Sequence, residues 1–201
     1  ERLSVLHLLY GLMLRSGNDS AVALALHAGG SCENFAKMMN EQAHKIGAFD
    51  SNFVNPHGLH NDNHYTTAYD LAVISSAAMK NKIFSEIVST KRIEIPCTAR
   101  NYNRVLYNKN KMLTLYGGAT GIKTGYTKKA GRCLVSSAKR DGMELICVVL
   151  DCGPMWEVSM RSMDYVYANY KLEKYLHPYT YWGNLEVKNR NQKIGCYTKE
   201  S

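Results

Sequence analysis

Two three-residue motifs carry side chains that could take part in chemistry. Ser16-Gly17-Asn18 supplies a hydroxyl and a carboxamide in a turn between two helical segments, and Lys123-Thr124-Gly125 supplies an ammonium group and a hydroxyl on a strand-like segment. Such groups can hydrogen-bond a substrate and carry protons. Each motif alone is a weak signal, because Ser, Gly and Asn are expected where a helix breaks and Lys-Thr-Gly also fits an exposed strand end. Considered separately, each motif is better explained by a role in local structure, a helix break or a strand end, than by a role in chemistry.

A third group of reactive side chains is the loop that holds His57, His60, Asp62 and His64. These residue types are acceptable zinc ligands. Their spacing is not that of the helical HExxH motif, in which two histidines share one helix face. The spacing therefore disfavours a metal site, and we predict no metal or cofactor.

The sequence Ser136-Ser137-Ala138-Lys139 fits a Ser-x-x-Lys pattern, in which a serine nucleophile is paired with a lysine. It falls on a segment predicted to be a strand, where residues three apart point to opposite faces. On a helix the two side chains would share a face. We therefore reject Ser136 as a nucleophile.

The elements that must position these residues are helices in the first part of the chain. Apolar residues recur at helical spacing over residues 3–14. A second helix over residues 20–28 is apolar nearly all round, which predicts burial. A third begins after Ser31 and stops at Gly47, and a fourth opens at residues 67–70 with the form of a capping box. Residues 83–115 show no clear period and are predicted to be loops and short strands.

The later part of the chain predicts an antiparallel sheet. Residues 132–139 and 143–150 are β-rich and are joined through Arg140-Asp141-Gly142, which indicates a hairpin. Residues 121–127 are the expected third strand, and 155–170 are expected to form a closing helix. Helices followed by an antiparallel sheet and another helix indicate the α+β class, with helices packed on the sheet.

Composition and charge bound the possible functions. The 201 residues are 45% apolar and 21% charged, which is typical of a globular protein. The net charge of +8 raises the possibility of a nucleic-acid binder, but the Lys and Arg residues are scattered in short groups such as Lys109 with Lys111 and form no basic stripe. A solvated basic surface, or attraction to anionic wall polymer or lipid head groups, fits better.

The six cysteines leave two alternatives open. No pair has CxxC spacing, which disfavours structural zinc. Disulfides in an exported protein and free thiols in a reducing or anaerobic habitat are both compatible with the sequence.

Four longer stretches carry a resemblance to a known family. Residues 9–21 (LYGLMLRSGNDSA), 53–59 (FVNPHGL), 64–72 (HYTTAYDLA) and 121–127 (GIKTGYT) resemble the low-molecular-mass penicillin-binding proteins that act as serine-type D-Ala-D-Ala carboxypeptidases. The stretches occur in the order found in that family, and the resemblance extends to about residue 170. It implies a β-lactamase/DD-peptidase-like transpeptidase fold, incomplete in this chain, and a reaction through an acyl-enzyme.

The resemblance also implies roles for individual residues. Ser16 would relay a proton to the leaving amine, Asn18 would hydrogen-bond the substrate backbone, and Lys123 would supply fixed positive charge. As substrate-binding residues, Thr124 would donate a hydrogen bond to the substrate carboxylate and Gly125 would let the substrate lie close to the strand. The backbone N–H of Tyr126 would be a donor of the oxyanion hole.

The family's Ser-x-x-Lys motif lies at the start of a helix several dozen residues before the position of Ser16, so we expect an N-terminal truncation and a chain that is inactive alone. The expected partners are peptidoglycan pentapeptide ending in D-Ala-D-Ala and β-lactam inhibitors, with no nucleic acid. The expected location is the bacterial cell envelope, outside the cytoplasmic membrane, with membrane association through a C-terminal anchor.

Two domains are expected, a partial DD-peptidase domain over residues 1–170 and a linker with the beginning of a β-rich domain over residues 171–201. The alternative function, from a different class, is a non-catalytic domain that binds peptidoglycan or β-lactam.

Overall fold

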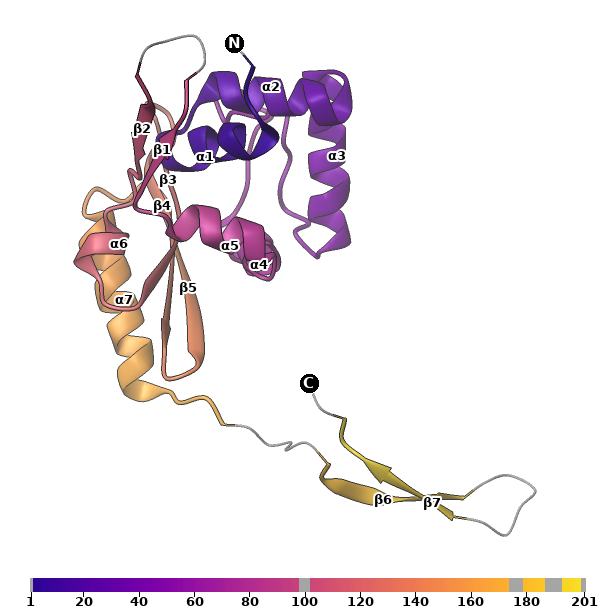
Figure 1. The fold of residues 1–201 in the computed structure, drawn as a ribbon. Helices are drawn as coiled ribbons and strands as arrows, with labels where there is room; N and C mark the ends of the chain where they lie inside the picture. The colour runs from indigo at the N-terminus through magenta and orange to yellow at the C-terminus, as the bar shows by residue number, and fades with distance from the viewer. Residues whose placement is uncertain (1, 98–101, 174–178, 187–192, 200–201) are drawn as a thin grey trace. The chain divides into compact units, whose positions relative to one another are not determined.

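The computed structural model describes residues 2–97, 102–173, 179–186 and 193–199. The chain divides into two compact units, residues 1–169 and 170–201. Figure 1 shows the first unit as helices and an antiparallel sheet, and the second as a hairpin.

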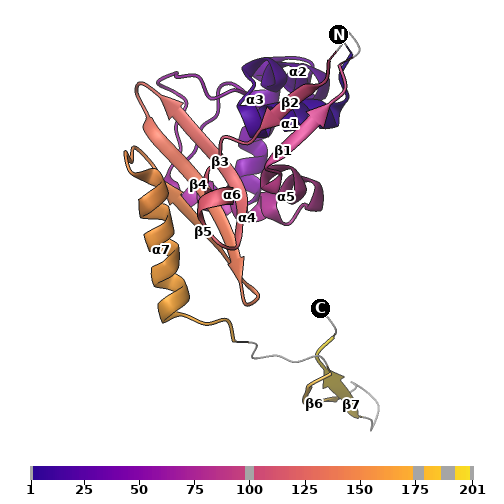
Figure 2. The same ribbon diagram turned by 60° about the vertical axis from the view of Figure 1, so that its left-hand side comes forward.

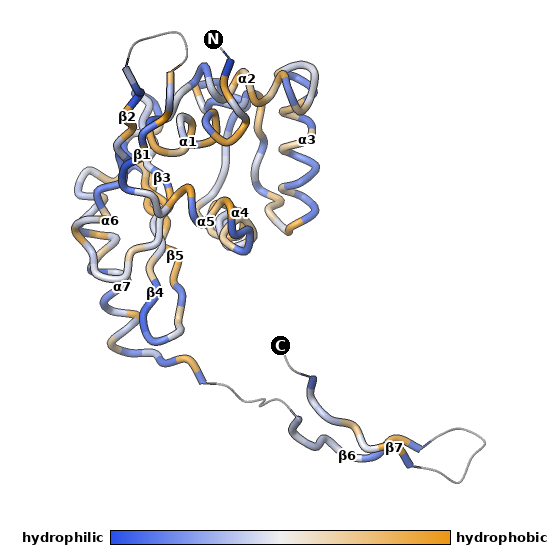
Figure 3. Tube along the Cα trace, in the orientation of Figure 1, coloured by the Kyte–Doolittle hydropathy of each residue, from blue (hydrophilic) through white to orange (hydrophobic). Residues whose placement is uncertain are grey.

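Three helices open the first unit: α1 (Val5–Arg15), α2 (Asn18–Gly29) and α3 (Cys32–Lys45). The Ser4 hydroxyl caps α1 by accepting from a backbone N–H, and Ser31 caps α3 in the same way. Figure 3 shows α1 as a largely apolar segment and α3 as a largely hydrophilic one.

Helix α2 differs from its prediction. Its sequence is apolar nearly all round, which predicts burial, yet Ala21 and Ala25 are its only buried residues and the Leu26 side chain is exposed. Its most extensive contacts with other elements are with α1 and α3. Within the described part of the chain, two neighbouring helices therefore cover only one side of it.

A long loop leads from α3 to α4 (Ala68–Met79). The Thr67 hydroxyl caps α4 by accepting from the backbone N–H of Asp70 at 3.1 Å. The Asp70 carboxylate, which is buried, turns back to the loop and accepts from the backbone N–H of Asp50 at 2.7 Å and from the Ser51 hydroxyl at 2.6 Å. Asp70, in the first turn of α4, thus also fixes the loop before the helix.

Residues 83–115, predicted as loops and short strands, contain more regular structure than expected. Helix α5 (Lys82–Ser89) and the one-turn helix α6 (Met112–Leu115) flank a two-stranded sheet, β1 (Arg92–Ile95) with β2 (Arg104–Tyr107). Each element is short, so none repeats its apolar pattern often enough to be recognised from sequence.

The main sheet has the order β3-β4-β5 and is antiparallel, with β3 at Ala119–Thr127, β4 at Gly131–Arg140 and β5 at Met143–Val149. The predicted hairpin is confirmed. Asp141 and Gly142 both have positive φ, 49° and 82°, which is the geometry of a tight two-residue hairpin turn.

Helices cover both faces of this sheet. Helix α7 (Met155–Asn169) packs on β4 and β5 from one side, while α4 contacts β5 and α5 contacts β3 from the other (Figures 1 and 2). The α7 side holds a buried cluster that includes Met112, Leu134 and Met163. The predicted α+β class, with helices packed on an antiparallel sheet, is confirmed.

The second unit contains the hairpin of β6 (Tyr181–Glu186) and β7 (Lys193–Tyr197). The rings of Tyr181 and Tyr197 lie across from each other with centroids 5.4 Å apart. Such a cross-strand aromatic pair stabilises a hairpin.

Candidate active site

Ser16 occupies the turn that ends α1. Its backbone is left-handed, with φ 58° and ψ 47°, and its N–H donates to the Leu12 carbonyl at 2.9 Å. The Ser16 bond is the 5→1 bond of an αL C-cap, and the Gly17 N–H donates to the Gly11 carbonyl at 3.2 Å. A Cβ at Gly17 would lie 2.9 Å from side-chain oxygens of the next helix, so glycine allows the chain to re-enter a helix at once. This turn holds the Ser16 hydroxyl outside both helices.

Lys123 lies on β3, at one edge of the main sheet. Its Nζ donates a hydrogen bond to Ser16 Oγ and a second, of 2.9 Å, to the Thr124 carbonyl. The two motifs are 107 positions apart in the sequence and meet directly through these side chains.

Burial, with a smaller contribution from the positive charge of Lys109, lowers the pKa of Lys123 to about 8. The ammonium is therefore mostly protonated at neutral pH but close to its titration range. A group of this kind can supply positive charge to a bound anion and can also exchange a proton with the adjacent Ser16 hydroxyl.

The other predicted site residues lie on the same two segments. Asn18 is the first residue of α2 and its side chain is exposed. Thr124 is half-buried, while Gly125 and Tyr126 are exposed on β3. Gly125 lies opposite Cys133, and a Cβ there would approach the Cys133 Cβ to 3.7 Å, an ordinary contact distance. The structure thus joins Ser16 to Lys123 and places the remaining four beside them on α2 and β3.

The outer edge of β3 is open. In the described part of the chain, β3 pairs only with β4. An extended peptide could add to this edge through main-chain hydrogen bonds, as peptides do at exposed sheet edges. Such a peptide would run past Lys123.

Sequence reasoning missed the contribution of Lys109. It grouped this residue with Lys111 as a scattered surface charge, because no local pattern connects it to Ser16 or Lys123. Only the folded chain shows that Lys109 lies close enough to lower the pKa of Lys123.

The Ser-x-x-Lys sequence at 136–139 lies on β4. Ser136 and Ser137 are fully buried, and Lys139 is exposed. The Ser137 hydroxyl hydrogen-bonds the Thr120 hydroxyl at 2.8 Å, and Ser136 Oγ donates to the Cys147 carbonyl at 3.4 Å. Both hydroxyls are thus buried and hydrogen-bond neighbouring strands of the sheet.

In the histidine loop, imidazole side chains accept hydrogen bonds from backbone N–H groups of the same loop. His64 Nδ1 accepts from the Val54 N–H at 3.1 Å, and His57 Nδ1 accepts from the Leu59 N–H at 3.2 Å. Burial lowers the pKa of His64 and so favours the neutral, accepting form. Across the residues that the structure covers, no group of three or more His, Cys, Asp or Glu side chains could hold a metal ion.

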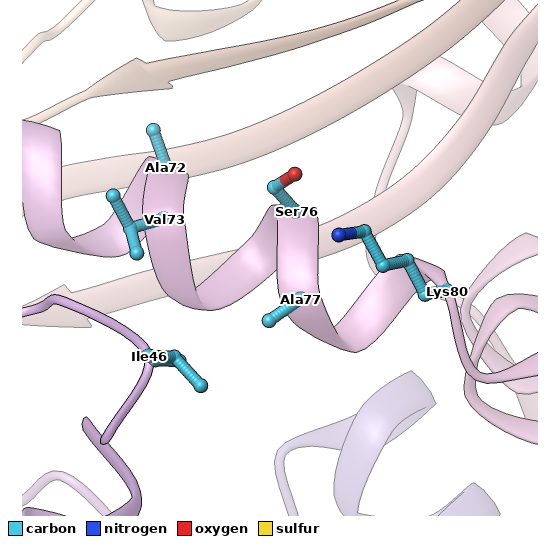
Figure 4. A pocket seen from close by; sticks show the side chains of 6 residues that line it. All are labelled: Ile46, Ala72, Val73, Ser76, Ala77 and Lys80. Atoms are coloured by element: carbon cyan, nitrogen blue, oxygen red, sulfur yellow. The ribbon is translucent and has the colours of Figure 1, made fainter. Parts of the chain in front are cut away.

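A groove of about 520 Å³ lies away from these motifs. Figure 4 shows its lining, which comes from α4 and the end of α3: Ile46, Ala72, Val73, Ser76, Ala77 and Lys80. Its walls are mostly aliphatic and include neither motif, so we place the candidate chemistry at Ser16 and Lys123.

Residues 1–153 match the model of the Peptidase S11 family, D-alanyl-D-alanine carboxypeptidase. The chain belongs to this family. The resemblance predicted from residues 9–21, 53–59, 64–72 and 121–127 is confirmed.

Curated relatives agree with this assignment. The chain is 31% identical over 199 residues to D-alanyl-D-alanine carboxypeptidase DacF of Bacillus subtilis, covering 96% of this chain and 50% of that protein. It is 36% identical over 169 residues to DacB2 of Mycobacterium tuberculosis, covering 80% of this chain and 57% of that protein. The chain thus spans about half the length of the curated relatives it matches.

Solved structures share the fold. A mutant of the Streptomyces K15 DD-transpeptidase superposes with a TM-score of 0.78 at 35% identity, over 83% of this chain and 69% of that one. The Francisella tularensis D-alanyl-D-alanine carboxypeptidase DacD gives 0.79 at 25% identity, over 98% and 61%. The predicted DD-peptidase fold is confirmed. No helix in the described ranges combines the length and the hydrophobicity that crossing a membrane requires.

Proposed function

We propose that this chain supplies the substrate-recognition part of a serine-type D-Ala-D-Ala carboxypeptidase acting on peptidoglycan stem peptides. The observation that carries the proposal is the hydrogen bond from Lys123 Nζ to Ser16 Oγ, which joins the two motifs of the family at one point. The open edge of β3 beside that contact suits an extended peptide substrate.

The reaction would be acyl transfer. A serine hydroxyl of the intact protein attacks the carbonyl between the two D-alanines, its Oγ–C bond forms, and the C–N bond to the terminal residue breaks. The proton from the nucleophile passes to the leaving amine through Ser16, with Lys123 as its hydrogen-bonded neighbour. Water then hydrolyses the ester and restores the serine.

The remaining residues would position the substrate. Asn18 hydrogen-bonds its backbone, and the Thr124 hydroxyl donates to its terminal carboxylate. Gly125 keeps the edge of β3 open, as its exposure allows. The backbone N–H of Tyr126 stabilises the oxyanion.

On this proposal, residues 1–170 are a partial DD-peptidase domain and residues 171–201 begin a β-rich domain. β-lactams would acylate the same serine, and the protein would work in the bacterial envelope, outside the cytoplasmic membrane and attached through a C-terminal anchor.

One observation favours an alternative, a non-catalytic domain that binds peptidoglycan or β-lactam. The single Ser-x-x-Lys sequence of these 201 residues begins at Ser136, whose side chain is fully buried on β4. Release of D-alanine from a pentapeptide by the intact gene product distinguishes the two functions. We expect release by the wild type and a loss of at least 100-fold in Lys123→Ala, because one electrostatic contact to the reacting groups typically contributes that much. Binding without release in the wild type would support the non-catalytic domain.

A further inference from the structure

The turn that joins β3 to β4 is short, and hydrogen bonds fix its backbone. The hydroxyl of Thr127, the last residue of β3, accepts from the N–H of Ala130 at 3.0 Å, so the turn closes on itself. Gly131 then begins β4 in a left-handed conformation with φ 67°. At the next residue, the Arg132 carbonyl accepts from the Cys152 N–H at 2.8 Å, which ties the start of β4 to the segment after β5. The tip of the turn is therefore held at one place beyond the end of β3.

Two positive charges lie at this tip. Lys128 and Lys129 are adjacent in the sequence and both are exposed. Asp151 lies against the turn, at the position where Gly131 has no side chain. Even so, among the described residues no carboxylate forms an ion pair with either lysine. Both ammonium groups are therefore open to an anionic ligand.

The proposed function sets the direction in which a substrate runs along β3. The terminal carboxylate lies at Thr124 and the scissile carbonyl at the N–H of Tyr126, which is two residues nearer the turn. The residues before the scissile bond therefore continue past Thr127 towards the tip of the turn. The two lysines follow Tyr126 by two and three positions, or roughly 7 to 10 Å at the rise of an extended strand.

A peptidoglycan stem peptide carries an anion at a matching distance. Its second residue is a D-glutamate that is joined to the third through its side chain, so the α-carboxylate of the glutamate is free. This carboxylate lies two residues before the one that bears the scissile carbonyl, which is also roughly 7 to 10 Å away in an extended peptide. The anion of the substrate and the charges of the turn therefore lie at the same distance from Tyr126.

The geometry points to Lys128 and Lys129 as specificity-determining residues that bind the free α-carboxylate of the stem-peptide glutamate. This inference rests on the proposed function, which places the scissile carbonyl at Tyr126. Both lysines lie outside the two motifs and several residues from the reacting bond, so they select the substrate and take no part in bond breaking.

The test compares two substrates that differ only in this charge. The first is acetyl-L-Ala-γ-D-Glu-Nε-acetyl-L-Lys-D-Ala-D-Ala, and in the second the glutamate α-carboxylate is replaced by a carboxamide. With the intact gene product, we expect kcat/KM to be about fivefold higher for the acid than for the amide, because exposed charge pairs contribute modestly. Lys128→Gln combined with Lys129→Gln should lower kcat/KM about fivefold for the acid and less than twofold for the amide. Lys128→Arg combined with Lys129→Arg should retain the preference for the acid.

The matched control is Lys37→Gln combined with Lys45→Gln, which removes the same charge from two exposed positions of α3. It should leave both substrates unchanged within twofold. Equal kcat/KM for acid and amide in the wild type overturns the inference. An equal loss on both substrates in the turn variant, or the same loss of preference in the α3 variant, also overturns it.

A second readout separates this inference from the proposed function. If the wild type releases no D-alanine from either peptide, the proposed function is refuted, and the affinities of the same two peptides decide the role of the lysines. These affinities are measured by NMR from the backbone amide signals of residues 124–129, which requires no turnover. Binding of the acid about fivefold more tightly than the amide, with the difference lost in the turn variant and kept in the α3 variant, supports the role. Equal affinity for acid and amide, or no binding of either, overturns it.

Discussion

Replacing Lys123 by methionine should make the protein more stable while removing its activity. Burial holds the pKa of Lys123 at about 8, against an ordinary value of 10.5. At about 1.4 kcal/mol per pH unit, that difference means that keeping the charge in the folded state costs about 3.5 kcal/mol. Methionine has a similar shape and carries no charge.

The hydrogen bonds of Lys123 offset part of this gain. Loss of the bonds to the Ser16 hydroxyl and to the Thr124 carbonyl costs about 1 to 2 kcal/mol in total, since the net value of one hydrogen bond is typically about 0.5 to 1.5 kcal/mol. Lys123→Met should therefore raise the free energy of unfolding by about 2 kcal/mol at pH 7. The same kind of trade between stability and function is common at active sites.

The effect should vanish at high pH. Below pH 8 the lysine is charged in both the folded and the unfolded chain, and the folded state bears the full cost of burial. Between pH 8 and 10.5 the folded state releases the proton while the unfolded chain keeps it, so the unfolded state binds more protons and stability rises with pH. Wild type and variant should therefore differ by about 2 kcal/mol less at pH 9.5 than at pH 7.

Urea unfolding of the intact gene product at the two pH values measures this difference. Lys111→Met, at an exposed position, is the control and should change stability by less than about 0.5 kcal/mol at either pH. The reasoning is refuted if Lys123→Met unfolds at lower urea than the wild type at pH 7, or if its advantage does not depend on pH.

Three further changes test the fold and the site. Asp70→Ala should lower the free energy of unfolding by about 2 to 3 kcal/mol, because it removes a buried acceptor from the Asp50 N–H and from the Ser51 hydroxyl, which keeps only its bond to the Thr66 hydroxyl. Asp50→Ala, which removes an exposed carboxylate and keeps the backbone donor, should change it by less than about 0.5 kcal/mol in the same urea assay. Gly131→Ala should cost more than about 2 kcal/mol, since its Cβ would lie 1.9 Å from a carboxylate oxygen at a φ of +67°; Gly142→Ala, with positive φ but open space, should cost only about 1 kcal/mol in thermal unfolding. Ser136→Ala should label with penicillin as fast as the wild type, and a loss of labelling would show that this buried serine matters to the chemistry.

The long periodic segments of this fold can be predicted from the sequence because their signals are local. Helix α1 was expected at residues 3–14 and lies at Val5–Arg15, and α7 was expected at 155–170 and lies at Met155–Asn169. The Asp141-Gly142 turn was equally clear, because few residues other than Gly, Asn and Asp accept positive φ. The order of the sequence motifs then indicated the protein family and, with it, the DD-peptidase-like fold.

What the sequence does not predict depends on contacts between distant segments. Helix α5 and the β1-β2 pair are too short to show a period, and pairing decides their structure. The exposed sides of α2 follow from which helices pack on it. Lys109 approaches Lys123 only because Asn108 and the Leu14 carbonyl fix its loop, and no spacing in the chain encodes that approach.

The most direct test of the proposed acyl-enzyme is labelling with a fluorescent penicillin. The intact gene product and this 201-residue chain are incubated with the label, and the products are treated with hydroxylamine, which cleaves an ester. We predict a covalent, hydroxylamine-sensitive adduct on the intact protein only, with labelling strongly reduced in Lys123→Ala. A correctly folded intact protein that does not label would contradict the serine mechanism and favour the non-catalytic binding domain.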